Sequence, residues 1–198
     1  MTLPLDMLPG PDFADLKPVL SERLARLGDS IRAEQFAGLL DPLFCHVLRQ
    51  GFVEAGADEG TLWLPDEESR HLVPVYNSGP AAAELVGRFK QPLSDGLISM
   101  VFASEQSFLE NEVSKNAQQS KLLDGMLQTQ TCAMIAVPFY FLRACRGVLS
   151  CVQLKHPGSA ASAPPGFRPE HLSCIERTGA VASQLIEFRL LSCAVGWS

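Results

Sequence analysis

Six cysteines have the most varied chemistry in this chain, because a thiol can bind a metal, form a disulfide or act as a nucleophile. They are Cys45, Cys132, Cys145, Cys151, Cys174 and Cys193. No two of them form a C-x-x-C pair, and none stands at zinc-finger spacing from a histidine. Free cysteine is usually buried, so we expect most of these residues to be small core residues in a reducing compartment.

Catalysis by side chains needs a nucleophile, a base and an orienting group that converge. The sequence contains no G-x-S-x-G, no P-loop, no H-E-x-x-H and no paired-carboxylate motif. The acidic run Asp66-Glu67-Glu68 is typical of a solvated turn, and we interpret His46 as a helix histidine rather than a metal ligand. The sequence therefore predicts neither an enzyme nor a metal site.

The composition and charge of the chain indicate which classes of binding partner to expect. The chain has 198 residues, of which 46% are hydrophobic, with a net charge of −6 and a pI near 5.2. This suits the core of one domain, and scattered Lys and Arg give no attraction toward nucleic acid or an anionic membrane. No segment approaches the ~20 apolar residues of a membrane-spanning helix, and the N-terminus lacks the basic start of a signal peptide. We therefore expect a cytoplasmic protein that binds neither nucleic acid nor membrane.

Two helical stretches follow a Pro/Gly-rich arm over residues 1–12, which we expect to be flexible. The first stretch, over residues 13–32, has apolar residues at three- and four-residue intervals, and this narrow stripe makes it a candidate for dimerisation. The second stretch runs from about Ala33 to Glu54, and Pro42 inside it is expected to kink it or to divide it in two.

The pattern then becomes that of strands. Residues 60–65 and 71–76 are short, apolar and β-prone with turn residues between them, which predicts a hairpin. A short helix is expected over residues 81–86. Ser94 or Asp95 is expected to cap the helix that comes next.

The second half of the chain predicts the centre of a sheet. Residues 106–110 are expected to form a brief strand, and residues 114–129 a polar segment and a helix. Residues 132–139 and 147–154 are almost continuously apolar, which is typical of central strands covered on both faces, here joined as antiparallel neighbours. A last helix, over about residues 169–191, carries a stripe at near-heptad spacing on which another helix could pack: Leu172, Ile175, Gly179, Ala182, Ile186 and Leu190.

The order of these elements resembles that of the GAF domain, a small-molecule-binding signalling domain. The strings that resemble its segments are Gly60-Thr-Leu-Trp-Leu, the segment from Asp95 to Leu109, the segment from Glu112 to Asp124, Ala133-Met-Ile-Ala-Val-Pro and Gly147-Val-Leu. The resemblance implies an α+β sandwich: a central antiparallel sheet of about five to six strands, with the terminal helices on one face and pocket helices and loops on the other. The GAF-like domain would span residues 33–192, followed by a tail over residues 193–198.

In that family the pocket lies under helices and loops that correspond here to residues 93–130. The resemblance therefore suggests six residues that line a ligand site: Ser94, Ile98, Phe102, Asn116, Asp124 and Thr131. The alternative is a cavity filled by side chains, for which the candidates are Met100, Phe102, Leu123, Met126 and Leu127. We expect Asp124 to bond backbone N–H groups rather than a ligand, and Trp63 to be a core residue.

The chain departs from two ligand-specific branches of the family. Members that bind cyclic nucleotides carry an acidic residue where this chain has Gly125, and members that bind bilins carry a cysteine and a histidine where residues 118–131 contain neither. The ligand and any cofactor therefore remain unidentified.

The resemblance implies a regulatory or sensory domain that binds a small molecule. It would signal through its terminal helices to a partner or an output domain outside this chain, and would form a homodimer through those helices. A second possibility is a non-catalytic dimerisation scaffold with a filled pocket. A cysteine-based free-methionine sulfoxide reductase, with Cys132 near the pocket, ranks below both.

Overall fold

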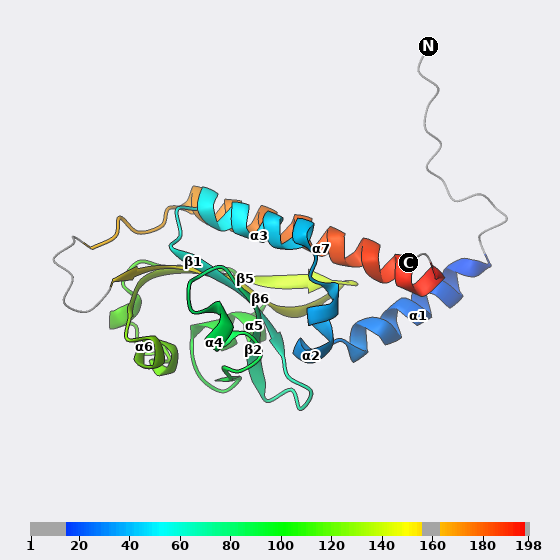
Figure 1. Cartoon of the computed structure of the whole chain (residues 1–198), viewed down its shortest axis with the longest axis horizontal. Coiled ribbons are helices and arrows are strands. Elements are labelled where there is room, and N and C mark those ends of the chain that lie inside the picture. The colour runs from blue at the N-terminus through cyan, green and yellow to red at the C-terminus, as the bar shows by residue number, and fades with distance from the viewer. Residues whose placement is uncertain (1–14, 156–162, 197–198) are drawn as a thin grey trace, which may run out of the picture.

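One antiparallel sheet of six strands forms the centre of the molecule, in the order β3-β2-β1-β6-β5-β4 (Figure 1). The computed structural model describes residues 15–155 and 163–196. The strands are β1 (Glu59–Pro65), β2 (His71–Asn77), β3 (Gln91–Pro92), β4 (Phe108–Glu110), β5 (Gln130–Phe141) and β6 (Ala144–Lys155). Helices lie on both faces, so the expected α+β sandwich is confirmed, with six strands.

The helices follow the predicted order closely. They are α1 (Leu16–Ser30), α2 (Ala33–Phe36), the 3-10 turn η2 (Ala37–Leu39), α3 (Pro42–Glu54), α4 (Ala82–Leu85), α5 (Leu97–Ser104), the 3-10 turn η3 (Val113–Lys115), α6 (Leu122–Leu127) and α7 (Pro169–Val195). Pro42 begins α3, and the Asp41 carboxylate accepts the Phe44 N–H at 2.6 Å, so the second helical stretch is divided at the proline. In the described part of the chain, no helix is long and apolar enough to cross a membrane.

The ends of the chain were predicted only in part. The predicted flexible arm over residues 1–12 lies outside the described residues, and so do residues 197–198 of the predicted tail. The last helix is longer than predicted: it continues through Cys193 to Val195 and ends at Gly196, whose φ of +77° is the left-handed conformation that stops a helix.

β5 and β6 form a long hairpin closed by Leu142 and Arg143. Both turn residues have a positive φ, 51° and 65°, which is the backbone of the two-residue turn that suits the twist of paired strands. Side chains alternate between the faces of the sheet, so Ile135 and Val137 face one core while Met134 and Ala136 face the other. The two apolar runs are therefore central antiparallel strands that are covered on both sides, as predicted.

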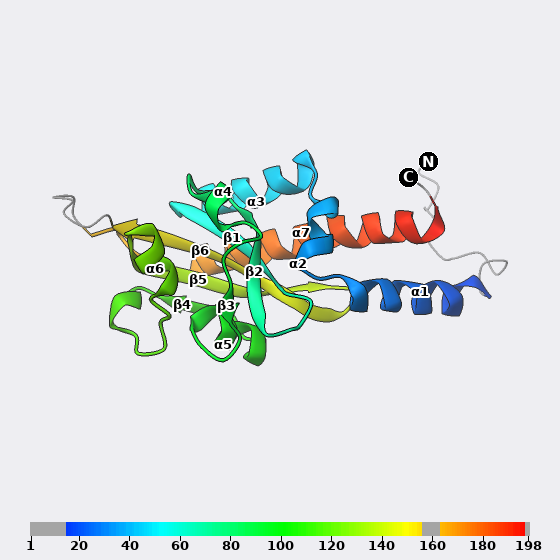
Figure 2. The same cartoon turned by 60° about the horizontal axis from the view of Figure 1, so that its bottom comes forward.

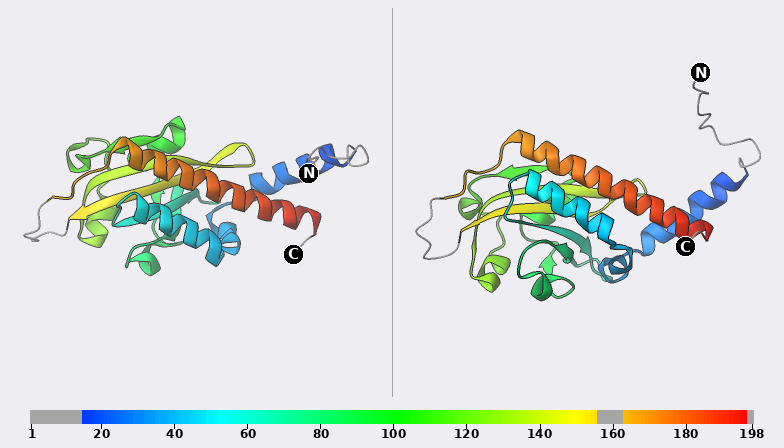
Figure 3. Two further views of the ribbon diagram at one scale, coloured as in Figure 1. Left: turned by 90° about the horizontal axis from the view of Figure 1, so that it is seen from above. Right: turned by 45° about the horizontal axis from the view of Figure 1, so that its top comes forward.

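α3 and α7 form the helical layer on one face of the sheet (Figure 3). The two helices approach closely because Gly51 of α3 faces Thr178 of α7: a Cβ at Gly51 would lie 2.1 Å from the Thr178 hydroxyl oxygen. The Arg189 guanidinium on α7 pairs with the Asp41 carboxylate at the start of α3. This layer encloses the larger of the two cores.

The predicted packing stripe on α7 faces inward. Ile175, Ala182 and Ile186 are fully buried, and Gly179 packs against the sheet side chains of Leu149 and Val137. These residues therefore pack within their own molecule, and the pairing of α7 with a second copy stays a prediction. A second stripe on the outer side of α7 is exposed at intervals of seven, three and four residues: Val181, Phe188, Leu191 and Val195.

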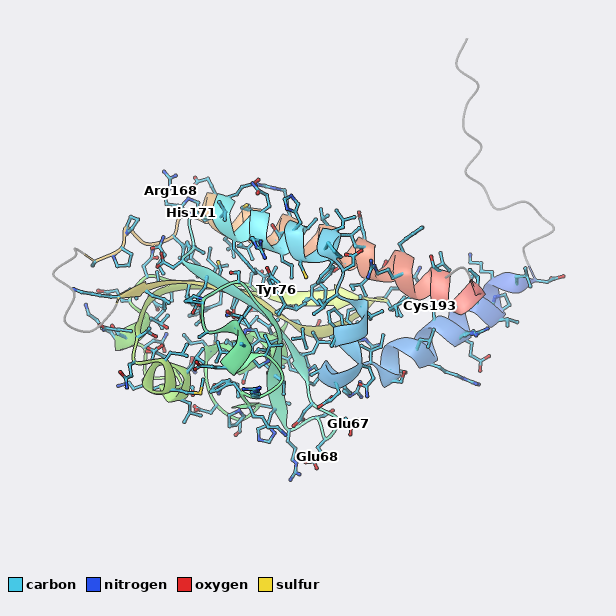
Figure 4. All side chains as sticks on the ribbon, in the orientation of Figure 1. Glu67, Glu68, Tyr76, Arg168, His171 and Cys193 are labelled. Carbon is cyan, nitrogen blue, oxygen red and sulfur yellow. The ribbon has the colours of Figure 1, made fainter. Side chains whose placement is uncertain are left out.

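α1 and the C-terminal part of α7 lie side by side beyond the end of the sheet (Figures 1 and 3). Cys193 lies on this part of α7 (Figure 4). The tip of the β5–β6 hairpin reaches both helices: the Leu142 N–H donates to the Glu187 carboxylate of α7 at 2.7 Å, and the Arg146 guanidinium pairs with Asp29 of α1 at 2.9 Å. The two terminal helices are thus tied to the same end of the same hairpin.

The turn between β1 and β2 contains the acidic run that the sequence suggested to be solvated. Glu67 and Glu68 are exposed at the tip of this hairpin, far from α3 and α7 (Figure 4). Asp66 differs, because it is only 3% exposed and accepts the N–H groups of Arg70 and His71. The prediction is wrong for Asp66, which is a structural residue of the turn.

Candidate functional site

α5 and α6 lie on the face of the sheet opposite α3 and α7 (Figure 2). Residues of these two helices and of the sheet line a small cavity. Its volume is about 40 Å³. It is lined by Trp63, Phe89, Gln91, Gly96, Leu97, Ile98, Gln119, Ser120, Leu123, Asp124, Thr131 and Met134. Pockets for drug-sized ligands measure roughly 300–1,000 Å³, so side chains already fill most of the space available here.

The wall formed by α5 depends on a glycine. Gly96 occupies the N-cap of α5 with a φ of +89°, and a Cβ there would lie 3.0 Å from the Gln91 amide nitrogen and 3.1 Å from Ser120 Cβ. No side chain caps the helix, so the predicted caps Ser94 and Asp95 are wrong. The turn is instead held by the Gln91 amide, which donates to the Asp95 carbonyl at 2.8 Å.

Asp124 connects α6 to the beginning of β5. Its carboxylate accepts the Thr131 N–H at 3.0 Å, the Thr131 hydroxyl at 2.7 Å and the Gln119 amide N–H at 2.9 Å. The expectation that Asp124 bonds a backbone N–H is confirmed, and two side-chain donors add to it. α6 contains no fully buried residue, and these bonds tie it to the beginning of β5.

The structure brings half of the predicted site residues to this cavity. Ile98, Asp124 and Thr131 line it. Ser94 lies in a separate surface cleft, Phe102 packs against the core on this side of the sheet, and the Asn116 carboxamide oxygen accepts the Gln118 N–H at 2.9 Å. None of these placements shows a bound molecule, so the role of the six residues in ligand binding stays a prediction.

The filling residues were also predicted only in part. Leu123 lines the cavity as proposed, whereas Met126 is exposed, and Met100, Phe102 and Leu127 are outside the lining. Trp63 is a core residue, as expected, and it lines the cavity as well. Its indole N–H donates to the Ser150 hydroxyl at 2.9 Å, so the ring is fixed against β6.

Sequence reasoning missed seven of the lining residues, which come from separate segments. They are Phe89, Gln91, Gly96, Leu97, Gln119, Ser120 and Met134. The Asp95-Gly96 pair carried the one available signal, because a glycine before a helix often marks a close backbone approach.

The electrostatics of the lining are simple. Asp124 is its single charged side chain, and among the described residues that line the cavity none is a lysine, arginine, histidine or cysteine. Within residues 15–155 and 163–196, no group of three or more His, Cys, Asp or Glu side chains is placed to hold a metal ion.

The cysteines are less uniformly buried than expected. All six are free thiols; Cys151 and Cys174 are buried and Cys193 is exposed, while the other three are half-buried. Burial raises the pKa of the Cys151 thiol to about 12 and also raises the pKa of Cys145, so neither is a ready nucleophile. Cys132 stands on β5 next to the lining residue Thr131 but is not itself part of the cavity wall.

No family model matches the sequence, and no curated protein matches it. Solved structures do match. The GAF domain of a phosphoenolpyruvate-protein phosphotransferase from Coxiella burnetii has a TM-score of 0.60 at 15% identity, covering 90% of this chain and 95% of that one. The second GAF domain of DevS from Mycobacterium smegmatis has a TM-score of 0.52 at 24% identity, covering 80% and 100%.

An enzyme with the same fold also matches. A free methionine-R-sulfoxide reductase from Neisseria meningitidis, solved with its substrate, has a TM-score of 0.56 at 15% identity and covers 91% of this chain and 93% of that one. Identities this low establish the fold alone. The sheet order, the two helical layers and these matches together show that this chain has the GAF-domain fold.

Proposed function

We propose that this chain is a non-catalytic regulatory domain that senses a very small molecule in the cavity beneath α5 and α6. The observation that supports this most is the lining of the cavity, which is mostly apolar with a few polar groups, as is usual for a binding site. The predicted cytoplasmic location is part of this proposal.

A continuous path supports signalling through the terminal helices. Thr131 and Met134 line the cavity on β5, and the far end of β5 closes the hairpin at Leu142. From there the bonds from Leu142 to Glu187 and from Arg146 to Asp29 lead to α7 and α1. A ligand that shifts β5 would therefore act on both terminal helices, and the output would lie in a partner or in a domain outside this chain.

We propose in addition that two copies pair along the outer side of α7. Val181, Phe188, Leu191 and Val195 are exposed there, and burying such a stripe against a second copy is favourable. The alternative scaffold function would use this surface in the same way but would keep the cavity closed to ligands.

A reductase function ranks last, because the described cavity lining contains no thiol. Turnover of free methionine sulfoxide by the purified protein, and its loss in Cys132→Ser, would establish the enzyme and remove the sensory proposal.

The test of the sensory function is native mass spectrometry, followed by thermal melts against small cations, anions and neutral compounds and against cyclic nucleotides and amino acids. A ligand that binds only the folded state raises the melting temperature. We expect a shift for one class of very small compound and none for nucleotides. If none of these compounds raises the melting temperature, the result favours the alternative function, a non-catalytic scaffold.

A further inference from the structure

A groove lies between α3 and α7, on the side of this helical layer that faces away from the sheet (Figure 3). Its volume is about 350 Å³, and the residues that shape it include Val47, Gln50 and Gly51 of α3 and Arg177, Thr178 and Val181 of α7. Gly51 and Thr178 are buried and form its floor, whereas Arg177 and Val181 are exposed at its rim. The groove is therefore open to solvent and large enough to receive an aromatic side chain.

Phe188 lies farther along the same side of α7. It is 67% exposed, more than any other large apolar side chain in residues 15–155 and 163–196. Phe188 follows the rim residue Val181 by seven positions, so the two share one side of the helix and stand about 10 Å apart along its axis. At this distance Phe188 does not line the groove of its own molecule, so the groove that can bury its ring belongs to a second copy.

The direction of pairing decides whether the ring reaches that groove. In a parallel pair of α7 helices related by a twofold axis, Phe188 faces Phe188 of the other copy, and both grooves stay about 10 Å away. In an antiparallel pair whose axis passes between residues 184 and 185, Phe188 of each copy faces Val181 of the other. The antiparallel pair makes this contact twice, as a self-complementary interface requires.

The charges on α7 favour the antiparallel direction as well. Arg177 is exposed, and in this register it faces Ser192 of the other copy, in the last turns of α7. The final carbonyls of a helix carry partial negative charge, so a guanidinium beside them is favourable, whereas a parallel pair places like helix ends together. Arg177 also stands at the rim that the ring of Phe188 would enter, and aromatic rings attract cations.

We propose that two copies of this chain pair antiparallel along α7, with the Phe188 ring of each inserted into the α3–α7 groove of the other. This inference rests on the pairing along α7 proposed above. It adds the direction and register of the two helices, and it makes α3 part of the interface.

Disulfide cross-linking of the full chain tests the direction. Arg177→Cys and Ser192→Cys are each made in Cys193→Ser protein, so that the exposed native thiol does not react. On oxidation at high protein concentration, we expect a cross-linked dimer when the two variants are mixed and little in either variant alone. Parallel pairing would give the reverse, with cross-links inside each variant and none added by mixing. Cys193→Ser protein without a new cysteine is the control.

A matched pair of valines on α3 tests the insertion of the ring. Val47 lines the groove, whereas Val53 is exposed on the same helix and lies outside the lining. Val47→Glu should weaken dimerisation at least about tenfold, because it places a charge against the buried ring of Phe188. Val53→Glu should leave dimerisation unchanged. Light scattering over a dilution series measures both, and thermal melts show that each variant is folded.

A second groove variant guards against loss of the fold in Val47→Glu. Gln50 is exposed at the rim, so Gln50→Trp should fold and should occupy the groove with its own ring. It should weaken dimerisation in the same way.

The outcomes separate this inference from the pairing on which it rests. Cross-links inside each single variant overturn the antiparallel direction and leave pairing along α7 standing. A dimer that neither Val47→Glu nor Gln50→Trp weakens overturns insertion into the groove and also leaves the pairing standing. A parent protein that is monomeric at every concentration overturns both.

Discussion

Asp66 and Asp124 each use one carboxylate to hold two neighbouring segments together. Asp66 accepts N–H groups from the beginning of β2, and its second oxygen lies 2.9 Å from the His71 ring nitrogen. Asp124 joins α6 to β5 in the same manner, through Thr131. Both residues therefore contribute to the shape of the domain before any ligand is considered.

The stabilising effect of Asp66 should depend on pH. Burial alone would raise the pKa of its carboxyl, but hydrogen bonds from the Arg70 N–H and from the ring and N–H of His71 lower it from 3.8 to about 2. A lowered folded-state pKa stabilises the protein above the unfolded-state value and loses this effect as the carboxyl is protonated. Asp66→Asn should therefore cost roughly 2 kcal/mol near neutral pH, and the difference should shrink as the pH falls from about 4 to about 2.

Urea unfolding at a series of pH values measures this difference. Glu68→Gln is the matched control, because Glu68 is on the same turn and is exposed. A difference between Asp66→Asn and the parent protein that stays constant down to pH 2 would contradict the explanation.

At this scale the sequence indicated the role of Asp124 but not that of Asp66. The resemblance to the GAF domain placed Asp124 in a polar segment, where backbone N–H groups need a hydrogen-bond acceptor. Asp66, Glu67 and Glu68 are acidic neighbours with the same composition, and burial of the first is decided by where the N–H groups of β2 lie. That position comes from strand pairing, which a local pattern does not contain.

At the scale of elements, two helical glycines differ in whether the packing around them leaves room for a side chain. Gly51 of α3 lies against Thr178, where a Cβ would approach the side chain to 2.1 Å. Gly125 of α6 has no atom within 4 Å of a Cβ built on it, and it is exposed. The first is required by packing, and the second only weakens its helix.

The same substitution at both positions tests this contrast. Gly51→Ala should lower the free energy of unfolding by about 1–3 kcal/mol, because Thr178 and α7 must shift. Gly125→Ala should raise it by about 0.5–1 kcal/mol, because alanine loses less backbone entropy in a helix. Both values come from urea unfolding, and effects of the same sign would show that the α3–α7 contact is looser than described.

The sequence predicted which segments are helices and strands better than it predicted which side of each helix faces the sheet. Continuous apolar runs defined β5 and β6, and Pro42 divided the second helical stretch, because these patterns are local. α7 carries apolar residues on two sides, so spacing alone did not reveal which side the sheet covers. The N-cap of α5 was predicted one or two residues early for a similar reason: Gly96 can adopt a φ of +89° and replaces a side-chain cap.

At the scale of the whole molecule, the outer side of α7 carries an exposed apolar stripe: Val181, Phe188, Leu191 and Val195. Phe188 is 67% exposed at its centre. Phe188→Glu should convert a dimer to a monomer without unfolding the domain, since the side chain makes little contact within its own molecule. Light scattering on the purified protein measures the mass.

The control for this change is Leu122→Glu, a similar substitution at a 52% exposed leucine on α6. It should leave the mass unchanged. A parent protein that is monomeric at high concentration, or a dimer that survives Phe188→Glu, would contradict pairing along α7.

The cavity is the part that the sequence predicted least well. Its lining comes from β1, the segment after α4, α5, the segment before α6, α6 and β5, and these segments meet only when the sheet has formed. Family resemblance indicated the region and three of the lining residues. The other lining residues are brought together by distances between those segments, which a local sequence pattern does not contain.

The length of α7 matters for the proposed signalling function. Its 27 residues extend about 40 Å, and its inner side is fixed to the sheet over much of that length. Beyond the sheet the helix continues unbroken to Val195, beside α1. A small tilt of α7 where it contacts β5 would therefore move its far end by a larger distance. If the proposed sensory function holds, a small displacement of β5 at the cavity would reach a partner at the far end of α7 as a larger one.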